Sequence, residues 1–408
     1  MTHASDTLLS TRRRHDIDAL RVFAFGLLIL YHVGMFYVAD WGWHIKSAYT
    51  AEWLQLPMLV VNQWRMPLLF LISGLAMSFI WGKYPAWRLA GKRTWRLLLP
   101  LVFGMAVICA PQAYYEAVSK GAIEPGFWEF MARYLRQGEF PADAWGGVEI
   151  ATWTWTHLWY LPYLLSYTLV LIPLAAAFRP AGGLLQRGLK LMRGPWLILL
   201  PILPLMLHGL FIYPHFPEMS HALFDDWYSH AMYFTFFLYG FLLGRNPGVW
   251  DELKRLRKLF FALAVVSFTA YYGMFNWLPD DSVPRGVELL VIYLNRWLWV
   301  IMVLGWGYHL LNRPRGWLTY ATEAVYPWYI LHQTLTIVAG YHLSKLALGP
   351  VIEPLLVLLA TFGGCYLLHE FVIRRVALLR PLFGLSFRPR EPASPGPSSP
   401  AKLSAVDA

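Results

Sequence analysis

The sequence predicts an all-α polytopic membrane protein with about ten transmembrane helices and both termini in the cytoplasm. Hydrophobic residues make up 57% of the 408 residues and charged residues only 14%, whereas a soluble domain carries about 25% charge. Apolar stretches of about 20 residues, the length that crosses a bilayer, recur along the whole chain. Lysine and arginine gather in alternate connecting segments, as they do in multi-pass proteins.

Ten stretches are apolar enough to be expected spans. The first follows the basic run Arg12–Arg14 and holds ionisable residues, so we interpret it as a retained helix rather than a cleaved signal peptide. The sixth is short. We expect the spans at 17–38, 56–81, 97–118, 156–178, 196–213, 229–244, 259–278, 287–310, 317–341 and 353–373.

The distribution of basic residues indicates how these spans are oriented in the membrane. With a cytoplasmic N-terminus, the two termini and four cytoplasmic loops hold 25 of the 34 Lys and Arg residues, and the outer loops hold six. The remaining three, Arg21, Arg65 and Arg296, lie within spans. This bias is the positive-inside pattern, and it explains the formal net charge of +10 better than nucleic-acid binding does.

We expect one membrane domain, at 17–375, between two cytoplasmic ends. Residues 1–16 form the N-terminal segment, and 376–408 form a tail that is mostly disordered because it is rich in Pro and Ser. In the long outer loop 119–155, the stretch PGFWEFMARYLRQGEF has the pattern of an amphipathic interfacial helix.

Several classes of site are absent from the sequence. Cys109 and Cys365 both fall inside spans and form no disulfide framework. The loop PHFPEMSHALFDDWYSH is rich in His and Asp, but its spacing matches no metal-ligand motif, so we expect no metal site. There is no P-loop, no GxSxG and no paired glycosidase carboxylate motif.

Three ionisable residues share one face of the first span. At about 100° per residue, Arg21 and His32 are roughly 20° from alignment, and Asp18 is about 40° from His32. His32 lies about 16 Å further along the axis than Arg21, in the outer half of the membrane. Ionisable groups inside a span are costly and are functional candidates. The alternatives are a helix-end pair for Asp18 and Arg21, and an interhelical hydrogen bond for His32.

The second span places Arg65 about 14 Å below the outer surface, close to the level of His32. The two side chains could therefore face one cavity. The alternative for Arg65 is a side chain that extends to the surface or pairs with a carboxylate. Ser73 and Gly74 in the same span permit a close approach of helices.

Further polar groups lie near these spans. The cytoplasmic stretch GKYPAWRLAGKRTWRLLLP holds a basic cluster that includes Arg93 and Arg96, either as a topology signal or as a site for phosphates. His157 opens the fourth span, and Glu323, Tyr326 and His332 lie in the ninth; we expect these to converge near the outer half.

These motifs resemble the acyltransferase-3 family of ten-helix membrane O-acyltransferases. DALRVFAFGLLILYH, FLISGLAMSF, KRTWRLLLP and YPWYILHQ are similar to its elements, in the same order, from about Asp16 to about Arg375. WHIKSA, WRMPLLFLISG and THLWYL resemble more narrowly a branch that succinylates periplasmic glucans. Two positions depart from that branch: Lys46 stands where a neutral residue is expected, and Gln333 follows His332 in place of a second histidine.

The resemblance implies a membrane O-acyltransferase of the bacterial inner membrane. It would move an acetyl or succinyl group from cytoplasmic acyl-CoA, a co-substrate, to a hydroxyl of an extracytoplasmic glycan or glycolipid, with no bound cofactor and no nucleic-acid partner. The alternative is a transporter or flippase for a glycan or lipid-linked intermediate. We expect His32 as base or acyl carrier, Arg65 as oxyanion or acceptor-orienting group, and Asp18 as the group that orients Arg21. Arg21, Arg93 and Arg96 would hold the donor, and the pocket would include His157, Tyr326 and His332.

Overall fold

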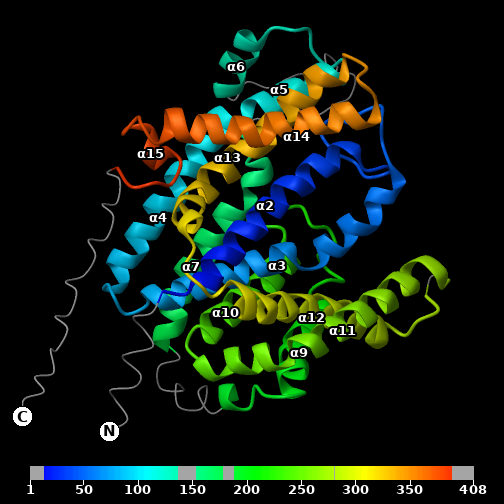
Figure 1. The fold of residues 1–408 in the computed structure, drawn as a ribbon, viewed down its shortest axis with the longest axis vertical. Helices are drawn as coiled ribbons and strands as arrows, with labels where there is room; N and C mark the ends of the chain where they lie inside the picture. The colour runs from blue at the N-terminus through cyan, green and yellow to red at the C-terminus, as the bar shows by residue number, and fades with distance from the viewer. Residues whose placement is uncertain (1–12, 137–152, 178–187, 280, 388–408) are drawn as a thin grey trace, which may run out of the picture.

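The computed structural model describes residues 13–136, 153–177, 188–279 and 281–387. Within these ranges the chain is built from helices, and its only β contact is an isolated bridge between Val38 and Ala51. The predicted all-α fold is confirmed, and Figure 1 shows the helices crossing one another in a single assembly.

The helices follow the predicted spans. The first half of the chain forms α2 (His15–Tyr37), η1 (Glu52–Leu54), α3 (Gln55–Ile80), α4 (Ala86–Phe103), η2 (Gly104–Ile108), α5 (Ala110–Ser119), α6 (Phe127–Leu135), η4 (Thr156–Trp159) and α7 (Tyr160–Ala177). The second half forms α9 (Trp196–Phe211), α10 (Trp227–Leu243), α11 (Pro247–Trp277), α12 (Arg285–Leu311), α13 (Gly316–Ser344), α14 (Gly349–Leu367), η5 (Leu368–Ile373) and α15 (Leu379–Leu382).

Each of the ten expected spans overlaps one of these helices or a continuous run of them, although α4 and α11 begin well before the expected bounds. Among the described residues, seven helical stretches are long and apolar enough to cross a membrane, and they include α2, α3, the continuous α4–η2–α5, η4–α7, α11, α12 and α14–η5. The helices at the other three positions, α9, α10 and α13, are not among the seven. A multi-pass membrane protein is therefore supported, and the number of ten spans stays a prediction.

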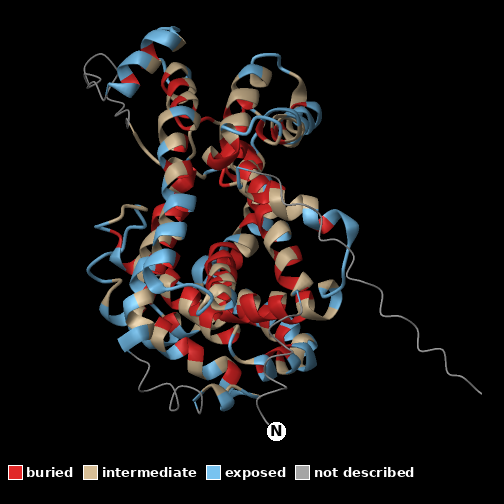
Figure 2. Cartoon of the chain, turned by 90° about the vertical axis from the view of Figure 1, so that its left-hand side faces the viewer, coloured by how far each residue is buried: buried red, intermediate tan, exposed pale blue. Residues whose placement is uncertain are grey.

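Helix α2 lies at the centre of the assembly, where it contacts α3, α12, α13 and α14. Its buried residues include Leu20, Ala24, Leu28 and Phe36. Figure 2 shows buried residues along the inward faces of the helices and exposed ones at the periphery. The exposed positions include many Leu, Val and Phe residues, as expected for a surface that faces lipid.

Helices α3 and α10 pack closely through two glycines. A Cβ at Gly74 would lie 1.9 Å from the carbonyl oxygen of Phe237, and a Cβ at Gly240 would lie 1.8 Å from that of Leu71. Neither position has room for a side chain, because the two backbones are in contact. This confirms the expected role of Gly74 and fixes α3, the helix that carries Arg65.

Helices α4 and α5 are joined by a π-helical turn, η2. Gly104 begins this turn, and a Cβ there would lie 2.3 Å from Cδ1 of Leu158, in η4 just before α7. The turn therefore lies against the helix that follows the long loop. π turns of this kind accommodate one residue more than a regular α-helix.

Two segments outside the spans are also ordered against the bundle. The predicted amphipathic helix appears as α6, which buries Phe130 and Tyr134 and leaves Trp128 81% exposed. At the C-terminal end, Phe383 packs against Phe103. The expected tail begins at 376, but packing continues through these residues, and 388–408 lie outside the described part of the chain.

Candidate active site

His32 and His332 form a direct pair between α2 and α13. Nε2 of His332 lies 3.1 Å from Nδ1 of His32, and the ring centroids are 4.9 Å apart. His332 is fully buried. Spacing along the first span predicted that His32 would face other functional groups. In the structure it contacts His332, another of the expected site residues.

The carbonyl partners of the two rings set their tautomers. Nδ1 of His332 lies 2.7 Å from the carbonyl oxygen of Tyr329, and because a carbonyl only accepts, this nitrogen carries the hydrogen. Nε2 of neutral His332 is then an acceptor for Nδ1–H of His32, which also donates to the carbonyl oxygen of Leu28 at 2.9 Å. Neutral His32 therefore has its lone pair on Nε2.

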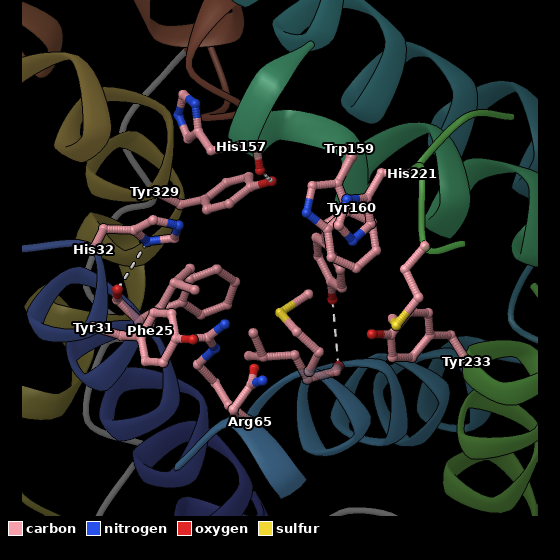
Figure 3. A pocket seen from close by; sticks show the side chains of 15 residues that line it. Phe25, Tyr31, His32, Arg65, His157, Trp159, Tyr160, His221, Tyr233 and Tyr329 are labelled. Atoms are coloured by element: carbon pink, nitrogen blue, oxygen red, sulfur yellow. Dashed lines mark hydrogen bonds between the residues drawn. The ribbon is translucent and has the colours of Figure 1, made fainter. Parts of the chain in front are cut away.

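A cavity of about 300 Å³ lies beside His32, and we name it the first chamber. Figure 3 shows His32, Arg65, His157 and Tyr233 around it. Helices α2, α3, α7, α10 and α13 all contribute side chains, so the chamber is enclosed by segments that are far apart in sequence. The prediction that Arg65 and His32 face one cavity is confirmed.

Arg65 is a buried cation with few partners. It is 7% exposed, and Nε and Nη1 have no hydrogen-bond partner in the described part of the chain. Its guanidinium lies over the ring of Tyr31, 3.6 Å from the centroid. Tyr233 also lines the chamber, and no carboxylate is among its described lining residues. Burying an arginine in this way is costly unless an anionic group enters the chamber.

His157 lines the first chamber, but both of its ring nitrogens are engaged. Nε2–H donates to the carbonyl oxygen of Ile330 at 3.0 Å, and Nδ1 accepts from the Thr156 hydroxyl at 3.1 Å. The hydroxyl of Tyr329 donates to the backbone carbonyl of His157 at 2.7 Å. These bonds connect η4, which leads into α7, to α13, so His157 fixes the wall of the chamber beside His332.

The basic residues predicted for the donor lie together at the other end of the bundle. Arg93 in α4 lies close enough to Arg96 and to Arg21 in α2 for the positive charges to repel one another. Tyr326 belongs to this group as well, because its hydroxyl donates to the carbonyl oxygen of Arg96 at 3.2 Å. The expectation that Tyr326 converges with His332 near the outer half is wrong, since Tyr326 lies almost two turns away on α13.

Two acidic residues also have partners that the sequence did not predict. Asp18 pairs with Arg13 at 2.9 Å, and no bond between Asp18 and Arg21 is seen among the described residues. Asp18 thus pairs at the helix end, about 21 Å along the axis from His32, but with Arg13 rather than with the expected Arg21. Glu323 pairs with Arg374 at 3.2 Å and lies with the C-terminal residues rather than with the histidines.

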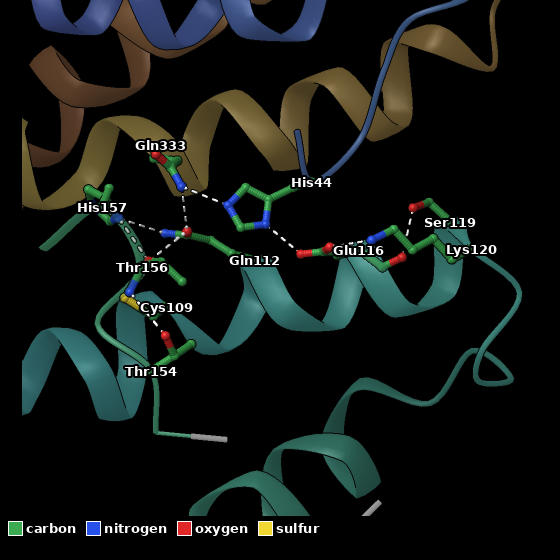
Figure 4. Close-up of polar contacts among 10 residues, drawn as sticks. All are labelled: His44, Cys109, Gln112, Glu116, Ser119, Lys120, Thr154, Thr156, His157 and Gln333. Carbon is green, nitrogen blue, oxygen red and sulfur yellow. Dashed lines mark hydrogen bonds and ion pairs between the residues drawn. The ribbon is translucent and has the colours of Figure 1, made fainter. Parts of the chain in front are cut away.

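A row of polar residues that the sequence analysis did not assign to the site runs beside His157 (Figure 4). Nε2 of Gln333 donates to Nε2 of His44 and to Oε1 of Gln112, both at 3.1 Å. Nδ1–H of His44 donates to the carboxylate of Glu116. The four-residue step from Gln112 to Glu116 places both on one face of α5, and this was the signal available in the sequence.

The loop that carries His44 is held in place by Lys46 and Ser47. The ammonium of Lys46 donates to the carbonyl oxygens of Met35 and Val38, so it caps the C-terminal end of α2. Partial burial lowers the pKa of Lys46 below its ordinary value. The Ser47 hydroxyl donates to the buried carboxylate of Glu353 at 2.6 Å. The basic residue at 46 is thus explained by a structural role in the loop.

Comparisons with known proteins identify the family of the chain. Residues 14–370 match the family described as Acyltransferase domain, the acyltransferase-3 domain. The chain belongs to this family. It is therefore an acyltransferase. Separately, no group of three or more His, Cys, Asp or Glu residues placed to hold a metal is found in the described ranges.

Curated relatives cover nearly the whole chain. It is 25% identical over 387 residues to the Glucans biosynthesis protein C of Escherichia coli O1:K1 / APEC, an alignment that covers 91% of this chain and 94% of that protein. The protein of the same name from Escherichia coli (strain K12) has the same identity and coverage. No solved structure shows a significant match.

Proposed function

We propose that this acyltransferase moves an acetyl or succinyl group from cytoplasmic acyl-CoA to a hydroxyl of an extracytoplasmic glycan or glycolipid, in the bacterial inner membrane. The observation that supports this best is the hydrogen bond from His32 Nδ1–H to His332, which leaves Nε2 of His32 able to accept a proton from a substrate. Arg65, in the same chamber, has two N–H groups without a hydrogen-bond partner in the described part of the chain. A sugar hydroxyl is a poor nucleophile at neutral pH and needs such a base.

The geometry suits a direct transfer. His32 Nε2 takes the hydroxyl proton as the oxygen attacks the thioester carbonyl, and Nδ1–H remains bonded to His332 while the ring is positively charged. The guanidinium of Arg65 stabilises the negative charge that develops on the carbonyl oxygen. The C–S bond then breaks, an ester C–O bond has formed, and the proton passes from His32 to the CoA thiolate.

The same residues also support transfer through an acyl-histidine. Nε2 of His32 would then attack the thioester carbonyl, and the C–S bond would break to release the CoA thiolate and leave an acyl-imidazolium. In a second step the hydroxyl would attack this acyl group, the C–N bond would break, and the hydroxyl proton would pass to the thiolate. In both versions Arg65 has the same task. An alternative task for Arg65 is to pair with the terminal carboxylate of a succinyl group, which would also satisfy its unpaired N–H groups.

Arg21, Arg93 and Arg96 are the residues we propose for the donor. Arg93 Nε has no hydrogen-bond partner in the described ranges although it is buried, and three arginines held near one another favour a ligand with several phosphates. The cluster lies toward the opposite end of α2 from His32, which fits a donor that enters from the cytoplasm.

The test is acyl transfer by the full chain reconstituted in a bilayer. The purified protein is supplied with acetyl-CoA or succinyl-CoA and with envelope glycans from cells that lack it, and mass spectrometry of the glycans measures the acyl group added. We expect one of the two donors to produce glycan esters in a His32-dependent reaction. Transport of unmodified glycan across the bilayer without esters would instead support the transporter.

A further inference from the structure

A second chamber adjoins the first, on the side of the polar row. It has a volume of about 530 Å³, within the roughly 300–1,000 Å³ typical of small-molecule sites. Both chambers are lined by His32, His157, Trp159 and His221. A ligand in the second chamber would therefore also reach His32, whereas Arg65 lines only the first chamber.

One wall of the second chamber is polar and rigid. It holds His44, Glu116 and Gln333, which form the continuous hydrogen-bonded row described above (Figure 4). Glu116 is further bonded to the ammonium of Lys120. Because each member is held by the next, their donors and acceptors keep fixed directions before any ligand enters.

Aromatic rings form much of the remaining lining. Trp43 and Trp155 line the second chamber but not the first, and both are only partly buried. Nε1–H of Trp155 donates to the backbone carbonyl of His221 at 3.1 Å, which holds its ring in place. Trp159 stacks on His221, 4.1 Å between centroids, so this pair closes the side shared with the first chamber.

The charge of the second chamber differs from that of the donor end. No Lys or Arg is among its described lining residues, and the carboxylate of Glu116 is paired with His44 and Lys120. A phosphate-bearing donor would find no cation there. A pyranose ring suits it, because its C–H faces pack on indole rings and its hydroxyls need a polar wall.

We propose that the second chamber binds the acceptor as an uncharged sugar, an inference that rests on the proposed acyl transfer. Trp43 and Trp155 contact the faces of the ring. The row His44, Glu116 and Gln333 binds its hydroxyls and leaves one hydroxyl directed at His32. The two substrates thus approach His32 from two chambers that share only four described lining residues.

The test compares Trp43→Ala with Trp53→Ala. Trp53 belongs to the segment that follows the same loop, is 72% exposed and lines neither chamber. The full-length variants in lipid nanodiscs are titrated with neutral gluco-oligosaccharides by calorimetry, without donor. We expect about tenfold weaker binding for Trp43→Ala, the size expected for an aromatic contact, and unchanged binding for Trp53→Ala. Trp43→Phe should recover most of the affinity.

Acyl transfer to the same oligosaccharides separates this proposal from the proposed function. The KM for the sugar should rise in Trp43→Ala and in Gln333→Ala more than the KM for the donor does. Wild-type transfer together with equal sugar affinity in Trp43→Ala, Gln333→Ala and wild type would overturn the chamber assignment alone. If sugar binding depends on Trp43 but the wild type transfers no acyl group, the assignment of the second chamber stands and the proposed transfer to a glycan is overturned.

Discussion

His332 accepts a hydrogen bond from His32 across 3.1 Å between α13 and α2. The Tyr329 carbonyl fixes the hydrogen of His332 on Nδ1, and this in turn leaves Nε2 of His32 as the basic atom. One imidazole thus does for another what a carboxylate does for the histidine of a hydrolase triad, but without a negative charge. This relationship makes the role of His32 testable with isosteric variants.

His32→Ala should insert normally yet lose acyl transfer, by about 10²–10⁴-fold for a general base and more for a covalent carrier. His32→Gln keeps polarity and can still donate to His332, but it cannot accept a proton near neutral pH. It should therefore be nearly as inactive as Ala. Transfer assays at matched expression, with donor binding confirmed, decide this. An active Gln variant would reduce His32 to an interhelical hydrogen-bonding residue.

Arg65→Gln should lower kcat/KM by about 10²–10³-fold if the guanidinium stabilises the oxyanion. The measurement is made with acetyl-CoA and succinyl-CoA in parallel, to whatever extent each is a substrate. An equal loss with both donors fits the oxyanion role. A loss confined to the succinyl donor fits pairing with its carboxylate, and a variant as active as wild type with both removes Arg65 from the reaction.

Arg93→Ala combined with Arg96→Ala should raise the KM for the donor with little change in kcat, because phosphate contacts act equally in the ground and transition states. Binding of CoA to the folded double variant, measured by calorimetry, is the direct readout. As a control, Arg133→Ala changes an arginine of the α6 segment, outside the cluster. CoA affinity equal in all three proteins would leave the cluster as a topology signal only.

The orientation has its own test. A reporter that is active only in the cytoplasm should be active when fused after Arg390 and silent when fused within 119–155, because the basic residues favour cytoplasmic termini. Activity of the loop fusion with a silent C-terminal fusion would reverse the orientation and, with it, the side from which the donor enters.

Gly240→Ala should destabilise the protein by at least about 1–3 kcal/mol, because the added Cβ overlaps the backbone of Leu71. Gly26→Ala is the matched control: it lies in α2 with no atom within 4 Å of the added Cβ, so it should stabilise the helix by about 0.5–1 kcal/mol. Thermal unfolding in detergent measures both. Equal melting temperatures would mean that α3 and α10 do not depend on this close contact.

The features that depend on the geometry of a single helix could be predicted from the sequence. Those that depend on contacts between two segments could not. The eleven-residue step from Arg21 to His32 and the depth of Arg65 follow from helical geometry alone, and both led to the chamber. The partner of Asp18 did not, because Arg13 precedes the helix and its path is set by packing. Tyr326 was misplaced for a related reason: two residues of one span can lie at different depths.

The polar row was missed because it combines a loop and two helices. Gln333 looked like a departure from the expected second histidine, and only the structure shows it donating to His44. Lys46 likewise looked out of place until its contacts with the end of α2 were seen. Local periodicity carries no information about such contacts, since they depend on which helices become neighbours.

The π turn at Gly104–Ile108 sets the rotation of α5 relative to α4 about the axis of the span that the turn interrupts. Arg93 and Gln112 are 19 residues apart, and in a regular α-helix they would point about 100° away from each other. The extra residue of the turn offsets this difference. Of the two halves, α4 packs against α7 and α5 packs against α13. Loss of a single residue here would shorten the span by only about 1.5 Å yet rotate one half of the site against the other. Relatives should therefore tolerate substitutions in this turn far better than a change in its length.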